Sequence, residues 1–151
     1  MHSLVRRYLK TGILFLGAGL ILGGWMIVNR ELYDASPSPY LVSAHTHAIL
    51  VGFIMMMILG VALWLFPRPD KTDLRYQPRM ASVAYWFLTI GTATRLVTEI
   101  LRDHSTSGAL RWIVVLSSFS QIAGIGLFFY TMWSRIRPAG SQKREEKGER
   151  F

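Results

Sequence analysis

The sequence predicts an all-α integral membrane protein, a bundle of four transmembrane helices that run up and down with both chain ends in the cytoplasm. Two observations lead to this fold class. Charged side chains are clustered in short segments, and long apolar stretches lie between them, with hydrophobic residues making up 51% of the 151 positions. Because a charge at the centre of a membrane helix costs about 3 kcal/mol, this separation favours a membrane protein over a soluble globule.

Four segments are long enough to cross a bilayer, since a hydrocarbon core of roughly 30 Å requires about 20 apolar residues in a helix. We expect these helices at about residues 8–28, 41–66, 80–101 and 109–134. Polar or proline-containing stretches separate them, and such short connections make consecutive helices antiparallel neighbours. Residues 1–138 therefore form one transmembrane domain. Residues 139–151 are charged and almost without apolar side chains, which predicts a disordered cytoplasmic tail.

The distribution of Lys and Arg predicts the orientation. Three precede the first helix, four lie between the second and third, and six follow the fourth, whereas the other side has only Arg30, Arg102 and Arg111. The positive-inside rule places the thirteen in the cytoplasm. This placement explains the net charge of +8 without nucleic acid as a partner, and the absence of cysteine excludes disulfides and thiolate metal ligands.

Two histidines, His45 and His47, lie near the start of the second predicted helix, one or two turns below the outer surface. Ionisable side chains inside membrane helices are rare and usually functional. Residues two apart on a helix point about 200° apart, so both rings cannot bind one centre unless the helix begins after them. The structural alternative is an interfacial pair held by water or by loop carbonyls.

The helical face of His45 continues through Ile49, Gly52, Met56 and Gly60. The two glycines leave a shallow groove, in which we expect either a flat macrocycle or a closely packed neighbouring helix.

Polar residues on the last two predicted helices could form part of the same outer layer. Arg95, Glu99 and Arg102 share one face of the third helix. Arg95 and Glu99 can form an ion pair that faces the bundle, or the two arginines can bind carboxylates such as haem propionates. For Gln121, near the middle of the fourth helix, an interhelical hydrogen bond is the first expectation and a ligand contact the second.

Glycines in the first predicted helix indicate a packing surface. Gly19 and Gly23 form a GxxxG pair, which is typical of close helix contacts within a chain or between copies.

The stretch His45-Thr-His-Ala-Ile-Leu-Val-Gly52-Phe, followed by Trp64-Leu-Phe-Pro67-Arg68, resembles a histidine-bearing helix of the haem–copper oxidase subunit I superfamily, which includes the nitric-oxide reductase large subunit. The resemblance covers about 25 residues. It implies that His45 or His47 ligates a low-spin haem near the outer surface. It also implies a multi-pass protein of a bacterial or archaeal cytoplasmic membrane.

The resemblance also shows what this chain lacks. The second haem ligand of the family lies on a later helix, and the copper-site histidines are missing because the third and fourth predicted helices contain no His. We therefore do not expect a complete oxygen- or NO-reducing enzyme from this chain alone. A second copy would supply the other ligand, or the haem would be five-coordinate with room for a gas. His104, in an outer loop, is a weaker third candidate.

Three hypotheses follow. The first is an oligomeric b-type haem protein in electron transfer or in O2 or NO binding, with an axial histidine, a porphyrin in the glycine groove, and Arg95 and Arg102 at the propionates. The second is a copper- or zinc-handling assembly protein that uses His45 and His47. The third is a non-catalytic accessory subunit of a respiratory complex.

Overall fold

The computed structural model describes residues 3–66, 78–136 and 148, and within these ranges the regular structure is entirely helical. The elements are α1 (Ser3–Tyr33), α2 (Pro39–His47), the π-helix η1 (Ala48–Met55), α3 (Met56–Leu65), α4 (Pro78–His104), α5 (Gly108–Met132) and the short 3₁₀-helix η2 (Trp133–Arg135). Apart from Gly148, the predicted tail lies outside the described residues, and so do eight of the thirteen basic residues that the sequence assigns to the cytoplasm.

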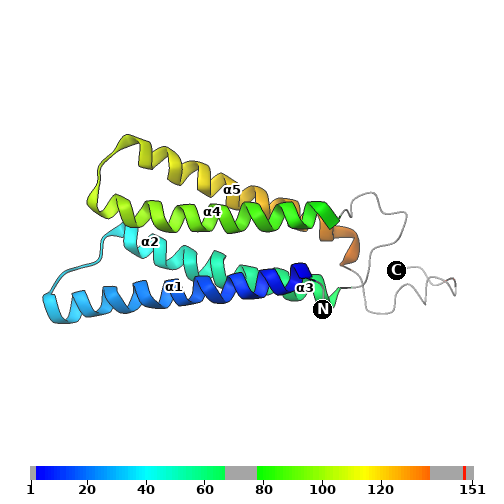
Figure 1. Ribbon diagram of the computed structural model, residues 1–151, viewed down its shortest axis with the longest axis horizontal. Helices are drawn as coiled ribbons and strands as arrows, with labels where there is room; N and C mark the ends of the chain where they lie inside the picture. Colours follow the sequence, from blue (N-terminus) through cyan, green and yellow to red (C-terminus); the bar gives the residue numbers. More distant parts are fainter. Residues whose placement is uncertain (1–2, 67–77, 137–147, 149–151) are drawn as a thin grey trace.

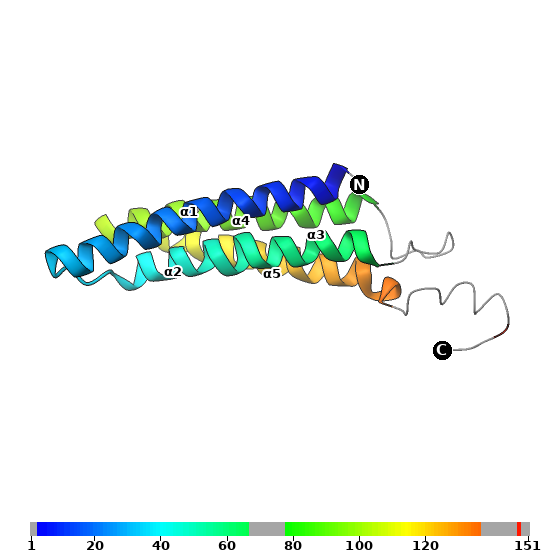
Figure 2. The same ribbon diagram turned by 90° about the horizontal axis from the view of Figure 1, so that it is seen from below.

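The helices lie side by side along the longest axis of the molecule (Figure 1). Elements α2, η1 and α3 follow one another as a continuous rod, which packs along α1 (Figure 2). Helix α5 packs along α4, and α2 joins the two halves by contacting α4. The start of α1 lies at the same end of the bundle as the end of α3 and the start of α4.

Three stretches are long and apolar enough to cross a membrane, namely Ser3–Tyr33, Pro39–Leu65 and Gly108–Arg135. Their outer faces carry exposed large apolar side chains such as Leu14, Ile21 and Leu116, which is the surface that lipid requires. Helix α4 is not among these stretches, because polar and charged side chains interrupt its apolar sequence. The membrane crossing of α4, the third predicted helix, stays a prediction.

The second predicted helix differs most from its expected form. Instead of one α-helix over residues 41–66, the wider turns of η1 separate α2 from α3. A π-helical segment closes its hydrogen bonds one residue further along the chain than an α-helix does, and such segments are frequent at functional sites. This segment begins directly after His47.

Helices α1 and α4 extend past the apolar stretches that predicted them, whereas α5 (Gly108–Met132) nearly matches the predicted residues 109–134. Helix α1 begins before and ends after residues 8–28, and α4 extends past both ends of residues 80–101. Polar residues beside an apolar stretch continue the helix because every turn satisfies further backbone hydrogen bonds. Predicted bounds therefore mark the apolar part of each helix rather than its full length.

An aromatic cluster holds α1 against the other half of the bundle. Tyr8 is fully buried, and its ring meets Tyr85 edge-on at a centroid distance of 5.1 Å and Phe128 at 5.9 Å. The Tyr85 hydroxyl also lies 2.8 Å from the Thr11 hydroxyl. Edge-to-face pairs add to the free energy of apolar burial, so this cluster stabilises the α1–α4–α5 packing.

Helix α1 fills the groove that the sequence predicts on the face of His45. A Cβ added to Gly52 would lie 2.5 Å from Phe15 Cγ, and one added to Gly60 would lie 3.0 Å from Tyr8 Cβ. Met56 is fully buried between these two positions. Of the two predicted occupants, a neighbouring helix therefore takes this part of the groove.

Arg135 differs from its expected place among solvated cytoplasmic charges. The residue is only 4% exposed, and its Nη2 donates to the carbonyl oxygens of Leu63 at 3.1 Å and Phe66 at 3.0 Å. Carbonyls at the end of a helix have no partner within the helix and favour a cation. Arg135 thus ties the end of α5 to the end of α3.

The tight contact at Gly52 predicts a stability effect. Gly52→Ala should lower the free energy of unfolding by about 1–3 kcal/mol. The new methyl group would clash with Cβ and Cγ of Phe15, which cannot move aside as the tip of a flexible side chain could. Thermal denaturation in detergent measures the change. Gly17→Ala is the matched control, since no atom lies within 4 Å of a Cβ there; equal melting temperatures for the two variants would contradict this packing.

Candidate functional site

The side chains of the two histidines of α2 contact different parts of the bundle. His45 faces α1, where its Nδ1 lies 2.8 Å from the Gly19 carbonyl oxygen. His47 Nδ1 lies 2.9 Å from the Ser43 carbonyl oxygen and 3.4 Å from the Ser43 hydroxyl, whose oxygen contacts Glu99 of α4. The opposed directions predicted from their spacing are confirmed, and the two rings do not converge on one centre.

The contact with Gly19 fixes the chemical form of His45. A carbonyl oxygen only accepts hydrogen bonds, so in a neutral ring Nδ1 carries the hydrogen and Nε2 carries the lone pair. Among the described residues Nε2 has no hydrogen-bond partner. A histidine that ligates a metal is commonly held in this way, with one ring nitrogen bonded to a carbonyl and the other free to coordinate.

The GxxxG pair of α1 makes this contact possible. A Cβ added to Gly23 would lie 2.7 Å from Cε1 of His45 and 3.0 Å from its Nδ1. A Cβ on Gly19 would meet Ile49 of η1. The predicted packing face is therefore confirmed as a contact within the chain, and its glycines bring the imidazole against the backbone of α1.

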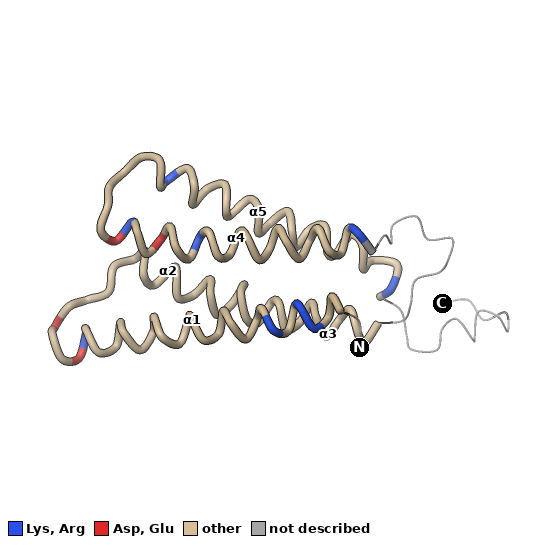
Figure 3. The backbone as a smooth tube through the Cα atoms, viewed as in Figure 1, with Lys and Arg blue, Asp and Glu red and all other residues tan. Residues whose placement is uncertain are grey.

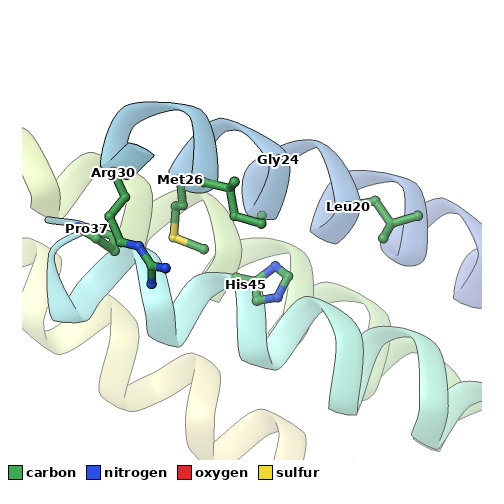
Figure 4. A pocket seen from close by; sticks show the side chains of 8 residues that line it. Leu20, Gly24, Met26, Arg30, Pro37 and His45 are labelled. Carbon is green, nitrogen blue, oxygen red and sulfur yellow. The ribbon is translucent and has the colours of Figure 1, made fainter. Parts of the chain in front are cut away.

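A pocket of about 470 Å³ opens beside His45, between α1 and the start of α2 (Figure 4). Small-molecule pockets are commonly about 300–1,000 Å³ in volume and mostly apolar. A Cβ on Gly24 would have no atom within 4 Å, so this glycine presents bare backbone on the side of the pocket. The lining residues are Leu20, Gly23, Gly24, Met26, Ile27, Arg30, Pro37 and His45.

Arg30 supplies the positive charge of this lining. Its guanidinium also pairs with Glu31 at 2.8 Å, and both side chains are largely exposed. Figure 4 shows Arg30 reaching from α1 toward α2, on the same side as Met26 and His45. A cation here favours a ligand with an anionic group at its edge and repels a bare metal cation.

A separate polar network links α2 to α4 on the other side of the rod. Glu99 is only 3% exposed, and its Oε1 accepts from the Ser43 hydroxyl at 2.8 Å and from Arg95 Nε at 3.0 Å. Its Oε2 is buried with no hydrogen-bond partner in the described part of the chain. The ion pair predicted between Arg95 and Glu99 is confirmed.

Helix α5 completes the network. Arg95 Nη1 donates to the Ser118 hydroxyl at 2.9 Å and to Gln121 Oε1 at 3.5 Å, and Gln121 Nε2 donates to the Thr92 hydroxyl at 3.0 Å. Gln121 thus makes the interhelical hydrogen bonds that were its first expectation. Arg95 Nη2 also donates to the Ser43 hydroxyl of α2 at 3.5 Å, so its contacts connect α2, α4 and α5.

Arg102 and His104, the other candidate residues, lie outside both the His45 pocket and the Arg95–Glu99 network. Arg102 Nη2 donates to the Tyr40 hydroxyl at 3.0 Å, and the guanidinium carbon lies 4.2 Å from the centre of that ring. The His104 side chain is 78% exposed and lies 3.8 Å from an oxygen of Asp103. Within residues 3–66 and 78–136, no three His, Asp or Glu side chains gather in a group that could hold a metal ion.

Of the lining residues, sequence reasoning named only His45 as a candidate site residue, and Met26 and Arg30 are the most informative of those it missed. Arg30 was counted only as an outer charge, and Met26 was not singled out. Both lie within two helical turns of Gly23, which was identified as a packing glycine. The spacing from that glycine could have indicated them, but their position beside His45 depends on how the loop with Pro37 brings α2 back onto α1.

The protein is thus an all-helical, membrane-type bundle in which a histidine, His45, lines a pocket near one end. The family model described as cytochrome C and quinol oxidase polypeptide I matches residues 3–144. The chain therefore belongs to this family, the haem–copper oxidase subunit I proteins, and the match extends far beyond the stretch that first resembled it. No curated protein and no solved structure matched the chain in the corresponding searches.

The buried ion pair generates a prediction about stability. Arg95→Met should lower the free energy of unfolding by about 3–5 kcal/mol, because it leaves the Glu99 carboxylate buried without its cation. The double variant Arg95→Met with Glu99→Leu should recover much of this loss, since neither charge is then left alone. Denaturation of both variants in detergent measures the difference, and a double variant less stable than Arg95→Met would contradict it.

Proposed function

We propose that this protein is a membrane b-type haem protein that works in electron transfer or in the binding of O2 or NO. It would act as a small relative of the respiratory oxidase subunit, without the copper chemistry of a complete oxidase. The observation that carries the proposal is the free Nε2 of His45 beside a mostly apolar pocket. Membership of the oxidase subunit I family supports haem as the ligand.

The residues of the pocket suit this cofactor. The imidazole is already held in the form that coordinates iron, and the apolar side chains of Leu20 and Ile27 would cover the macrocycle. The bare backbone at Gly24 leaves room for a flat ring. When bound, haem supplies an iron centre whose potential depends on its axial ligands and on nearby charge.

His45 is a better axial ligand than His47. His47 is not among the residues that line the pocket beside His45, and its ring hydrogen bonds within its own helix beside the buried ion pair. We therefore assign His47 a structural role in the contact between α2 and α4.

Arg30 is better placed than Arg95 to pair with a propionate. Arg95 is already bonded to Glu99, Ser118 and Gln121, whereas Arg30 lines the pocket itself. A guanidinium binds carboxylates through two parallel hydrogen bonds. Arg102, which stacks on Tyr40, would affect the site only through the packing of α2.

We also propose the orientation that the sequence predicts, with the start of α1 in the cytoplasm and α4 as the third of four crossings. Figure 3 shows basic residues at the starts of α1 and α4 and after α5, at one end of the bundle, whereas the acidic residues of the described chain lie toward the other end, where basic residues also occur. The positive-inside rule makes the basic end cytoplasmic. His45 and its pocket then lie near the outer surface.

Replacing each histidine tests the proposal. Protein purified with haem present during expression should show the Soret band and the reduced α and β bands of a b-type haem. His45→Ala should abolish haem retention because the coordinating nitrogen is removed, whereas His47→Ala should retain it. A colourless wild-type protein, or equal pigment in wild type and His45→Ala, would contradict the proposed function.

The position of the His45 imidazole against α1 can be tested without replacing the histidine itself. Gly23→Ala should shift the ring and lower haem occupancy, because the new methyl group would lie within 3 Å of two ring atoms. Gly17→Ala adds the same methyl group to α1 in open space and should leave haem content unchanged. The ratio of Soret absorbance to protein absorbance measures both, and equal ratios would show that Gly23 does not position His45.

A further inference from the structure

We propose that Met26 supplies the second axial ligand, so that the iron in this pocket is held by His45 of α2 and Met26 of α1. This inference rests on the proposed function, since it assigns the other side of the same haem. It answers a question that the sequence leaves open, namely which group would occupy the second ligand position.

The side chains that line the pocket include only two that donate an electron pair to iron. Leu20, Ile27, Pro37 and the two glycines have apolar or no side chains, and Arg30 is a cation without an acceptor. His45 provides an imidazole nitrogen and Met26 a thioether sulfur. Imidazole and thioether are a known pair of axial ligands for haem iron.

The place of Met26 on α1 is unlike that of its neighbours. Trp25 and Ile27 are 49% and 62% exposed, whereas Met26 is half-buried and lines the pocket. Figure 4 shows the Met26 side chain leaving α1 toward α2, in the space between Arg30 and His45. The sulfur therefore approaches the pocket from the helix opposite the one that carries the imidazole.

The properties of methionine suit this task at a helix–helix pocket. Its three rotatable bonds allow the sulfur to adapt to an inserted ligand, and its uncharged thioether adds no charge to an apolar site. Sulfur ligation raises the reduction potential of haem relative to ligation by a second histidine. The protein would then be an electron carrier with both iron positions filled, and a second copy would not be needed to complete the ligand set.

Replacing Met26 with leucine removes the sulfur and keeps a similar side-chain volume. We expect wild-type protein to contain low-spin haem, and Met26→Leu to retain haem that becomes high-spin, binds CO and has a lower midpoint potential. Met26→His should restore the low-spin spectrum by supplying a different ligand from the same position. Met57→Leu, on the apolar outer groove of α3, is the matched control and should match wild type.

The outcomes separate this inference from the proposed function. Haem that is low-spin in both wild type and Met26→Leu would overturn Met26 as the ligand, and so would high-spin haem in wild type. Either result leaves haem binding by His45 intact. A wild-type protein that binds no haem would overturn the proposed function and this inference together. Absorbance, electron paramagnetic resonance and a redox titration distinguish these cases.

Discussion

The hydrogen bond between His45 Nδ1 and the Gly19 carbonyl oxygen is the contact on which the candidate site depends. A carbonyl in the middle of α1 normally bonds within its own helix, and it has a second lone pair for this contact. The imidazole reaches it only because Gly23 has no side chain. One small residue thus determines the spacing of two helices, the tautomer of a ring and the availability of Nε2.

The buried network on the opposite side of α2 has a different effect on the structure. Apolar helices in lipid have little reason to prefer one neighbour, because lipid tails are as apolar as leucine. Arg95 and Glu99, with Ser43, Ser118 and Gln121, supply directional contacts that only one arrangement of α2, α4 and α5 satisfies. The network fixes α2 in rotation, and this rotation points His45 toward α1.

The sequence predicted the features that depend on composition and periodicity. Charge segregation predicted the helical membrane class, the two-residue spacing predicted opposed histidines, and the spacing of Gly19 and Gly23 predicted a packing face. The pocket could not be predicted in this way, because it depends on the path of the loop between α1 and α2. The burial of Arg135 depends on contacts with Leu63 and Phe66, far away in the chain, and local patterns do not record such contacts.

The Arg95–Glu99 pair and the polar residues of the α1–α2 pocket lie on opposite sides of α2, and this separation determines which of them can bind a ligand. In a low-dielectric interior, Glu99 holds Arg95 in a pair whose charges compensate, so this arginine is not free to attract an anionic ligand from the other side of α2. Arg30 is largely exposed, and its partner Glu31 is also in solvent, where exchange of one carboxylate for another has a small cost in free energy. Arg30, whose guanidinium can change partner, and His45, whose Nε2 has no partner among the described residues, therefore both line the α1–α2 pocket. Ligand binding is expected there rather than in the network that holds the helices together.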